Sequence, residues 1–204
     1  MPLQVYNELQ TYNDFCNENL AVARISELFA LSLGHCTIHA RQIGIAGLVH
    51  DIGKTLIDPA ILYKPDKLTM EEFEIMKTHT KLGSQIVFSA RHIPKEIKII
   101  MANVCEFHHE WHNGGGYWGV PAGWLPGYVS IVAITDVYVA CRSARAYKPS
   151  WPHEQTLAYL TSLAGTQFCS GIVDSFVRFA GNQENELMGV TAERRELESC
   201  EQKD

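Results

Sequence analysis

The chain lacks the features that would place it in several common classes of protein. It has no basic excess, because 23 acidic residues against 17 lysines and arginines give a formal charge of −6. Proteins that bind nucleic acid broadly carry a basic surface, so we expect no bulk nucleic acid as a partner, although a small anionic substrate stays compatible with local positive groups. The six cysteines are scattered without a C-x-x-C pair, which argues against a disulfide scaffold or a zinc ribbon and for a reduced protein.

Long hydrophobic runs are also missing. No segment approaches the ~18 consecutive apolar residues of a membrane span, and the most apolar stretch, residues 129–140, contains Asp136. The N-terminus has neither the basic start nor the apolar stretch of a signal peptide. We therefore expect a cytoplasmic protein with one medium-sized domain, since 46% hydrophobic residues are enough to build a core.

The strict alternation of apolar and polar residues that marks a strand is absent, and apolar residues recur at helical spacing instead. Leu20, Ile25 and Leu28 lie on one stripe of a first helix that Gly34 ends. Thr69 and Glu72 have capping-box spacing and open a strong helix to about residue 90. We predict an all-α fold, a helical bundle. Further helices are expected at residues 41–52, 94–109, 128–145, 154–163 and 170–179, with a short helical turn from 58.

Two segments differ in character from the predicted helices. Residues 112–127 carry six glycines and two prolines, and the aromatics Tyr117, Trp118 and Trp124 argue against disorder there. A loop of this length is usually functional, so we expect it beside a site. Residues 181–204 hold seven acidic residues against three basic ones and are predicted to be a polar tail. One folded domain is accordingly expected at residues 1–180, with residues 1–34 either completing the site or supporting a homodimer.

Histidines and carboxylates recur along the chain at intervals of about one helix. Imidazole and carboxylate ligands in a mixed set suit Fe, Mn or Zn better than Mg or Ca. A carboxylate inside an apolar run needs a partner, because burying an unpaired charge is costly. We predict that these side chains converge from separate helices on two metal ions, which would activate a shared water as hydroxide for attack on phosphorus. The series consists of His50, Asp51, His79, His108, His109 and Asp136.

Each member of this series has a simpler explanation when it is taken alone. His50 and Asp51 can form a buried hydrogen-bonded pair, and histidines at a helix end can interact favourably with the helix dipole. The recurrence of the whole series, rather than any one member, indicates the metal site. The remaining histidines are not expected to be ligands; they are His35, His39, His92, His112 and His153.

Four short motifs, in order along residues 41–179, carry a family resemblance. His50-Asp51-Ile52-Gly53-Lys54 matches H-D-x-x-K, and His79 with Gly83 matches H-x-x-x-G. His108-His109-Glu110 and the following Gly114-Gly115-Gly116-Tyr117 match H-H-E…D-G-x-G-Y-P, and Asp136-Val137-Tyr138 with Arg145, Tyr147 and Lys148 matches D-x-[FY]-D-A-L…R-x-Y-[RK]. The chain thus resembles the HD-GYP branch of the HD-domain metal-dependent phosphohydrolases.

The resemblance implies hydrolysis of the bacterial second messenger cyclic di-GMP to the linear dinucleotide or to GMP. It implies that the six residues of the series bind the metals, with Asp51 bridging them, and that Lys54 lies beside the scissile phosphate. Arg145 and Lys148 match positions that bind phosphate oxygens of the substrate. Tyr117 is expected either to cap the site, to stack on a guanine base or to anchor the loop.

The chain departs from the family pattern at several places. Trp118 replaces the proline of GYP, Asn113 the preceding aspartate, His112 a tryptophan, and Val139 a second aspartate. A Glu and a His four residues apart on the first helix are replaced at best by Asp14 and Glu18, which share a helix face. Glu18 is therefore predicted as an oxygen ligand, which leaves the metal count at two or three.

Three hypotheses follow. The first is a metal-dependent cyclic-dinucleotide phosphodiesterase, most directly for cyclic di-GMP. The second is a phosphohydrolase of another cyclic dinucleotide or nucleotide, since a changed loop can alter the pocket while the metals stay. The third is a catalytically weak, nucleotide-responsive binding or scaffold module, because the family loop is also linked to partners such as GGDEF cyclases. The intact ligand series favours an enzyme.

Overall fold

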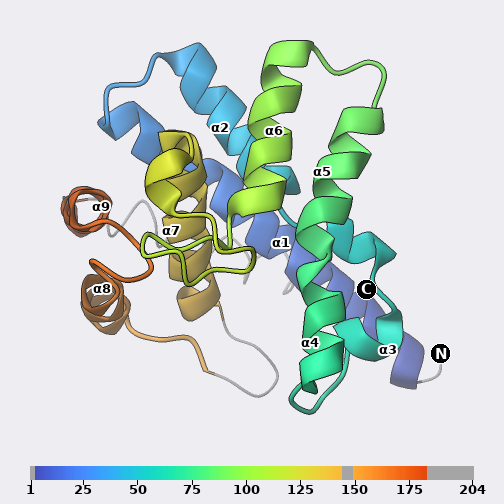
Figure 1. Cartoon of the computed structure of the whole chain (residues 1–204). Helices are drawn as coiled ribbons and strands as arrows, with labels where there is room; N and C mark the ends of the chain where they lie inside the picture. Colours follow the sequence, from blue (N-terminus) through green and yellow to red (C-terminus); the bar gives the residue numbers. More distant parts are fainter. Residues whose placement is uncertain (1–2, 144–148, 183–204) are drawn as a thin grey trace, which may run out of the picture.

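The computed structural model describes residues 3–143 and 149–182, and the all-α prediction is confirmed within them (Figure 1). These ranges contain no strand, only an isolated bridge between Ala164 and Phe168. No helix in them is both long enough and apolar enough to cross a bilayer. The elements are α1 (Leu3–Ser32), α2 (Thr37–Val49), η1 (Ile52–Leu56), α3 (Pro59–Leu62), α4 (Met70–Lys77), α5 (His79–Ser89), α6 (Lys95–Phe107), η2 (Ala122–Trp124), α7 (Gly127–Arg142), α8 (His153–Ser162) and α9 (Ser170–Asn182).

Local signals in the sequence placed several helix ends correctly. Gly34 follows α1 with φ +87°, the left-handed conformation that glycine adopts without strain. The predicted capping box is present, because the Thr69 hydroxyl accepts from the Glu72 N–H and the Glu72 carboxylate accepts from the Thr69 N–H. Asp58 caps the short α3 by accepting from the Ala60 N–H at 2.8 Å. These ends depend only on contacts within one turn, which is why sequence predicts them.

The prediction of one helix over residues 69–90 is wrong. The chain breaks at Thr78, where both the backbone N–H and the side-chain hydroxyl donate to the Ile75 carbonyl, at 3.0 and 2.6 Å. This tight turn separates α4 from α5, so His79 becomes the first residue of a new helix. The helix predicted at 41–52 likewise ends at Val49, and a 3₁₀ segment, η1, follows.

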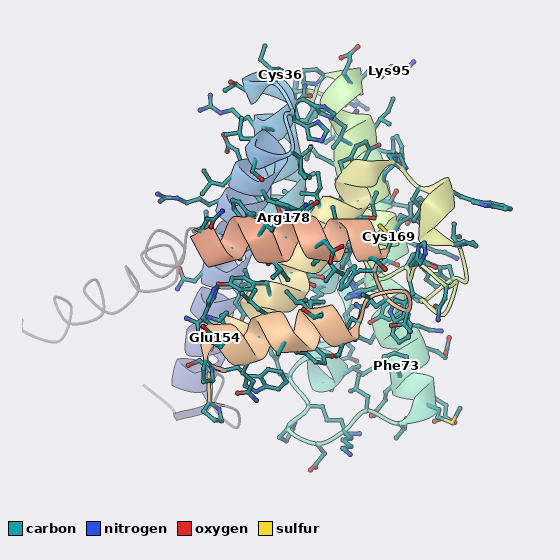
Figure 2. All side chains as sticks on the ribbon, turned by 90° about the vertical axis from the view of Figure 1, so that its left-hand side faces the viewer. Cys36, Phe73, Lys95, Glu154, Cys169 and Arg178 are labelled. Atoms are coloured by element: carbon teal, nitrogen blue, oxygen red, sulfur yellow. The ribbon has the colours of Figure 1, made fainter. Side chains whose placement is uncertain are left out.

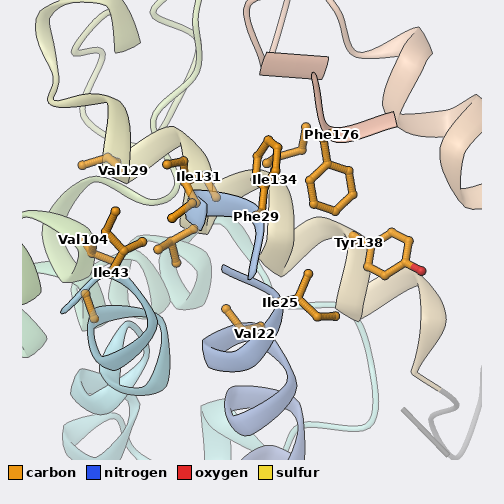
Figure 3. Packing of buried hydrophobic residues seen from close by; sticks show 14 of the residues in the cluster. Val22, Ile25, Phe29, Ile43, Val104, Val129, Ile131, Ile134, Tyr138 and Phe176 are labelled. Carbon is orange, nitrogen blue, oxygen red and sulfur yellow. The ribbon is translucent and has the colours of Figure 1, made fainter. Parts of the chain in front are cut away.

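The core lies where α1, α2, α6, α7 and α9 meet (Figure 3). Phe29 of α1 packs edge-on against Phe176 of α9, with ring centroids 5.0 Å apart, and Tyr138 of α7 contacts Phe176 at 5.3 Å. Figure 2 shows α8 and α9 side by side across one face, where they cover α1 and α7. This packing holds α7 rigidly against the helices that carry the other site residues.

The ends of several helices converge at another place in the fold. The end of α2, the start of α5 and the end of α6 meet there, because η1 packs on α5 and α6 packs on both α2 and α5. The glycine-rich loop leaves α6 at this place and leads to α7 (Figure 1). The predicted domain limits stay a prediction, and most of the expected tail, residues 183–204, lies outside the described residues.

Candidate metal centre

Each side chain of the predicted metal-binding series lies at a helix end or in the middle of α7. His50 and Asp51 directly follow α2, His79 opens α5, and His108 with His109 follows α6. His50, Asp51, His79 and His108 are buried, whereas His109 and Asp136 are half-buried. Four helices therefore contribute to one place, as the spacing of the series predicted.

Asp51 lies at the centre of this cluster. Its Oδ1 is 3.2 Å from His79 Nε2 and 3.6 Å from His108 Nε2. Its Oδ2 is 3.3 Å from His50 Nε2, which in turn is 3.6 Å from Asp136 Oδ1. One ligand atom each from Asp51, His79, His108 and His109 falls within 4.8 Å of the others. The carboxylate of Asp51 thus faces imidazoles with both of its oxygens, which is the geometry needed to bridge two cations.

Backbone carbonyls orient the three buried imidazoles. Nδ1 of His50 contacts the Gly47 carbonyl at 2.7 Å, Nδ1 of His79 the Met76 carbonyl at 2.6 Å, and Nδ1 of His108 the Val104 carbonyl at 2.9 Å. Because a carbonyl only accepts, Nδ1 carries a hydrogen in each ring, and Nε2 carries the lone pair whenever that ring is neutral. In metalloproteins, histidines that bind a metal are commonly oriented in this way, by a hydrogen bond from the other ring nitrogen.

The inward atoms of the cluster have no hydrogen-bond partner among the described residues. They are Nε2 of His50, His79 and His108 and Oδ1 of Asp51, all buried. Buried polar atoms are almost always paired, so four unpaired atoms that face one another favour a bound cation, which all of them can contact once each Nε2 is deprotonated. The nitrogen and oxygen donor set fits a divalent transition metal.

The charge states of the cluster residues are compatible with a bound cation. Burial opposes the charged form of Asp51, but Lys54 and His50 still hold its pKa well below the usual range. Burial opposes the charged form of Asp136 as well, but His50, whose Nε2 lies 3.6 Å from Asp136 Oδ1, lowers the pKa of Asp136. Burial lowers the pKa of His108 and, more strongly, that of His109. Near neutral pH the carboxylates are therefore charged, while these two imidazoles are neutral and able to ligate.

Lys54 and Tyr117 border the cluster. Lys54 Nζ lies 2.5 Å from Asp51 Oδ2, and about a quarter of its side chain is exposed. The Tyr117 ring stacks on His109 with centroids 4.4 Å apart and lies 6.2 Å from His79. Burial, together with the charges of Asp51 and Asp136, raises the pKa of Tyr117 to about 12, so its phenol stays protonated. Both residues are half-buried at the edge of the cluster.

Glu110 shapes the loop, a role that the sequence analysis missed. It is 4% exposed, and its two carboxylate oxygens accept the backbone N–H groups of Trp118 and Val120 at 2.7 and 2.8 Å. Gly116 crosses this residue so closely that an added Cβ would lie 2.5 Å from Glu110 Cα. The sequence signal available for this role was an acidic residue directly after a histidine pair and before a glycine-rich segment.

Replacing Glu110 with glutamine is expected to destabilise the fold by about 1.5–3 kcal/mol, because one of the two charge-assisted acceptors becomes an NH₂ group facing an N–H. Urea unfolding monitored by circular dichroism measures this loss. The matched control is Glu154→Gln on the exposed first turn of α8, expected to change stability by less than about 0.5 kcal/mol. Equal effects of the two substitutions would contradict the role of Glu110.

A model of the HD domain family matches residues 19–141. The chain belongs to the HD domain family. It is 34% identical to the cyclic di-GMP phosphodiesterase response regulator of Xanthomonas campestris, over 77% of this chain and 41% of that protein. It is 35% identical to a cyclic di-GMP phosphodiesterase of Thermotoga maritima, over 86% of this chain and 48% of that protein. A 3'3'-cGAMP-specific phosphodiesterase of Vibrio cholerae is 32% identical over 75% and 29% of the two lengths.

This HD domain spans less than half the length of each of those relatives. Among solved structures, an HDG"Y"P protein from Bdellovibrio bacteriovorus matches with a TM-score of 0.63 at 17% identity, over 82% of this chain and 52% of that one. At this identity the likeness concerns the fold. Taken together, the family model and the relatives confirm the resemblance to the HD-GYP branch.

Three residues predicted for the site are not brought into the cluster by the described structure. Arg145 and Lys148 lie outside the described residues, so their contact with substrate phosphate stays a prediction. Glu18 is a half-buried residue of α1 and lies outside the group within 4.8 Å, as do His50 and Asp136, although the contacts of His50 Nε2 join those two to the cluster. The role of Glu18 as a further oxygen ligand also stays a prediction.

The departures from the family pattern have local explanations in this HD domain. Asn113 Oδ1 accepts the Gly115 N–H at 2.9 Å, a turn that an aspartate would also make. Val139 is 1% exposed and belongs to the hydrophobic core. His112 donates its backbone N–H to the Gln167 carbonyl at 2.9 Å, which joins the loop to the α8–α9 connection.

A cavity of about 250 Å³ lies between this loop, α7 and the α8–α9 connection. Ala133 lines it, one helical turn before Asp136. The other lining residues are Glu110, His112, Gly123, Leu125, Val129, Ser130, Gln167, Phe168 and Cys169.

Proposed function

We propose that this HD domain is a metal-dependent phosphodiesterase that hydrolyses a cyclic dinucleotide, with cyclic di-GMP as its substrate. The observation that carries the proposal is the ring of buried, orphaned Nε2 atoms around Asp51. Support for the substrate comes from the identity of 34–35% to relatives named as cyclic di-GMP phosphodiesterases.

The residues that would hold the metals are those of the convergent series. Asp51 would bridge two divalent cations, with Fe or Mn as the physiological metals and Zn as the alternative, and Glu18 would contribute if a third ion binds. Bound cations of this kind supply positive charge that polarises a phosphoryl group and acidifies water. The series is His50, Asp51, His79, His108, His109 and Asp136.

The chain's own side chains would orient and neutralise the substrate. Lys54, held against Asp51 at 2.5 Å, would place its ammonium beside the scissile phosphate and offset part of its charge. Tyr117, fixed on His109, would form one wall for the nucleotide and could stack on a base. Arg145 and Lys148 would bind the remaining phosphate oxygens, which a chain of net charge −6 needs local cations to attract.

Metal affinity is expected to rise with pH. Burial by itself lowers the pKa of His50, but Asp51 and Asp136 overcome this and raise it to about 10, so Nε2 carries a proton near neutral pH in the metal-free protein. A cation using Nε2 must displace that proton, so affinity should increase about tenfold per pH unit below this pKa. Chelator-competition titration with Mn²⁺ between about pH 6.5 and about pH 8.5 measures the slope. An affinity independent of pH would contradict this charge state.

A second candidate substrate is 3'3'-cGAMP, because a phosphodiesterase specific for it is 32% identical to this chain. The same cluster and the same Lys54 would serve, and only contacts to one base would differ. A catalytically weak binding or scaffold module, with a GGDEF-type partner, is the remaining alternative. The homodimer and that partner stay predictions.

The test is to purify the chain, measure its bound metal and incubate it with cyclic di-GMP, 3'3'-cGAMP and cyclic di-AMP with added Mn²⁺ or Fe²⁺. Turnover of cyclic di-GMP that a chelator removes and Mn²⁺ restores would support the proposal. Turnover of another dinucleotide alone would select the second candidate. Binding without turnover of any of the three would refute the enzyme and leave the binding module.

A further inference from the structure

We infer that Trp118 is a positioning residue that locks the glycine-rich loop onto α5 and thereby sets the place of Tyr117 at the substrate side of the site. The inference rests on the proposed function, since it is the substrate that Tyr117 would border. The family pattern has proline at this position, and proline has no N–H to donate. Trp118 brings two donors instead, and both are used.

The two donors of Trp118 tie the loop to two different helices. Its backbone N–H donates to Glu110 Oε1 at 2.7 Å, just beyond the end of α6. Its indole N–H donates to Thr80 Oγ1 at 3.0 Å, in the first turn of α5. The Thr80 hydroxyl in turn donates to the Lys77 carbonyl at 2.9 Å, so its lone pairs face the indole. Thr80 is fully buried, which makes this acceptor a fixed point rather than a mobile surface group.

Two lysine ammonium groups also contact the ring of the Trp118 indole. Lys81 Nζ lies 3.5 Å from the ring centroid of Trp118, and Lys77 Nζ lies 5.7 Å from it. Ammonium groups at such distances are attracted by the negative face of the indole. The ring is therefore fixed by one hydrogen bond and two cations, all from residues 77–81.

The position of Tyr117 depends on the contacts of the adjoining Trp118 more than on a hydrogen bond of its own. Its own N–H donates only at 3.4 Å, to the His109 carbonyl. Its ring lies between His109, at 4.4 Å, and Phe73, at 5.7 Å with an interplanar angle of 83°. Since Trp118 adjoins Tyr117 in the chain, releasing the indole lets the Tyr117 ring shift along His109. The contacts of Trp118 are with Glu110, Thr80, Lys77 and Lys81 rather than with the cluster. Loss of the indole should therefore disturb substrate binding rather than metal binding.

The experiment compares Trp118→Phe and Thr80→Val, which remove the donor and the acceptor of one hydrogen bond, with their double variant. Each single change is expected to raise KM for the hydrolysed dinucleotide about threefold to tenfold, and the double variant should be no worse than either. The values of kcat and bound metal should stay within about twofold of the wild type. Thr80→Ser keeps the hydroxyl and should keep the wild-type KM. Trp124→Phe is the matched control, because Trp124 is 83% exposed in the same loop.

Amide hydrogen exchange gives a readout that does not depend on activity. The N–H groups of Trp118 and Val120, both bonded to Glu110, should exchange about threefold to tenfold faster in Trp118→Phe and at the wild-type rate in Trp124→Phe. Unchanged exchange, additive effects on KM, or a parallel fall of kcat and bound metal would each overturn the inference. A wild-type protein that hydrolyses no dinucleotide would refute the proposed function, while the exchange rates would still decide whether Trp118 locks the loop.

Discussion

Replacing Asp51 with alanine is expected to abolish phosphodiesterase activity, with a fall in kcat of about 10³-fold or more, and to remove most of the bound metal. The reason is that the Asp51 carboxylate is in contact range of His50, His79, His108 and Lys54 together. Without its carboxylate the imidazoles keep their backbone anchors but lose the group that joins them. Elemental analysis and turnover of cyclic di-GMP measure the two effects.

Two further variants make this result specific to Asp51. Asp51→Asn preserves the volume of the side chain but removes its charge, and should lose nearly as much metal as the alanine variant. Asp174→Ala changes an exposed aspartate of α9 and should leave metal and turnover at wild-type values. Full metal content in Asp51→Asn would show that the carboxylate is not a ligand, and the bridging role would have to be abandoned.

Replacing Gly53 with alanine should disrupt the site by pushing η1 and α5 apart. An added Cβ would stand 1.9 Å from the His79 carbonyl oxygen and 2.5 Å from the Gly83 backbone N, and neither atom can move without shifting α5. Since η1 follows Asp51 and α5 begins with His79, pushing these elements apart separates two residues of the cluster. We expect a loss of about 3 kcal/mol in the free energy of unfolding, together with loss of bound metal.

Gly171→Ala is the control for this change, because Gly171 is an exposed glycine of α9 with no heavy atom within 4 Å of an added Cβ. Alanine there should leave stability unchanged or raise it by up to about 1 kcal/mol. Urea unfolding and metal analysis of both variants make the comparison. A Gly53→Ala protein with normal stability and normal metal content would show that the close approach of η1 and α5 is not required.

Residue chemistry and spacing allowed much of the site to be predicted. His50, Asp51, His79 and His108 could be chosen from the sequence because few side chains bind metals and because their intervals match helix lengths. The capping box at Thr69 and the helix end at Gly34 were equally readable, since each involves atoms only a few residues apart. All-α architecture followed from the same periodicity.

Other features were hidden because they arise from contacts between distant segments. The break at Thr78 interrupts a sequence that favours one continuous helix, and the packing of α5 on η1 joins segments whose contact the helical pattern does not reveal. In the sequence Gly53 is only one residue of a motif, whereas in the structure the His79 carbonyl leaves no room for a side chain at this position. Glu110 reads as a charged residue next to two histidines until two loop N–H groups are found on its carboxylate.

The residues alone therefore told which groups could bind metal and phosphate, because donor chemistry belongs to each side chain wherever it lies. Which atoms of those groups face one another was decided by the packed helices. The Nδ1 of three histidines had to find backbone carbonyls before Nε2 could point at Asp51. Such orientation depends on the positions of segments about 30 residues apart in the chain, and that information exists only once the core has formed.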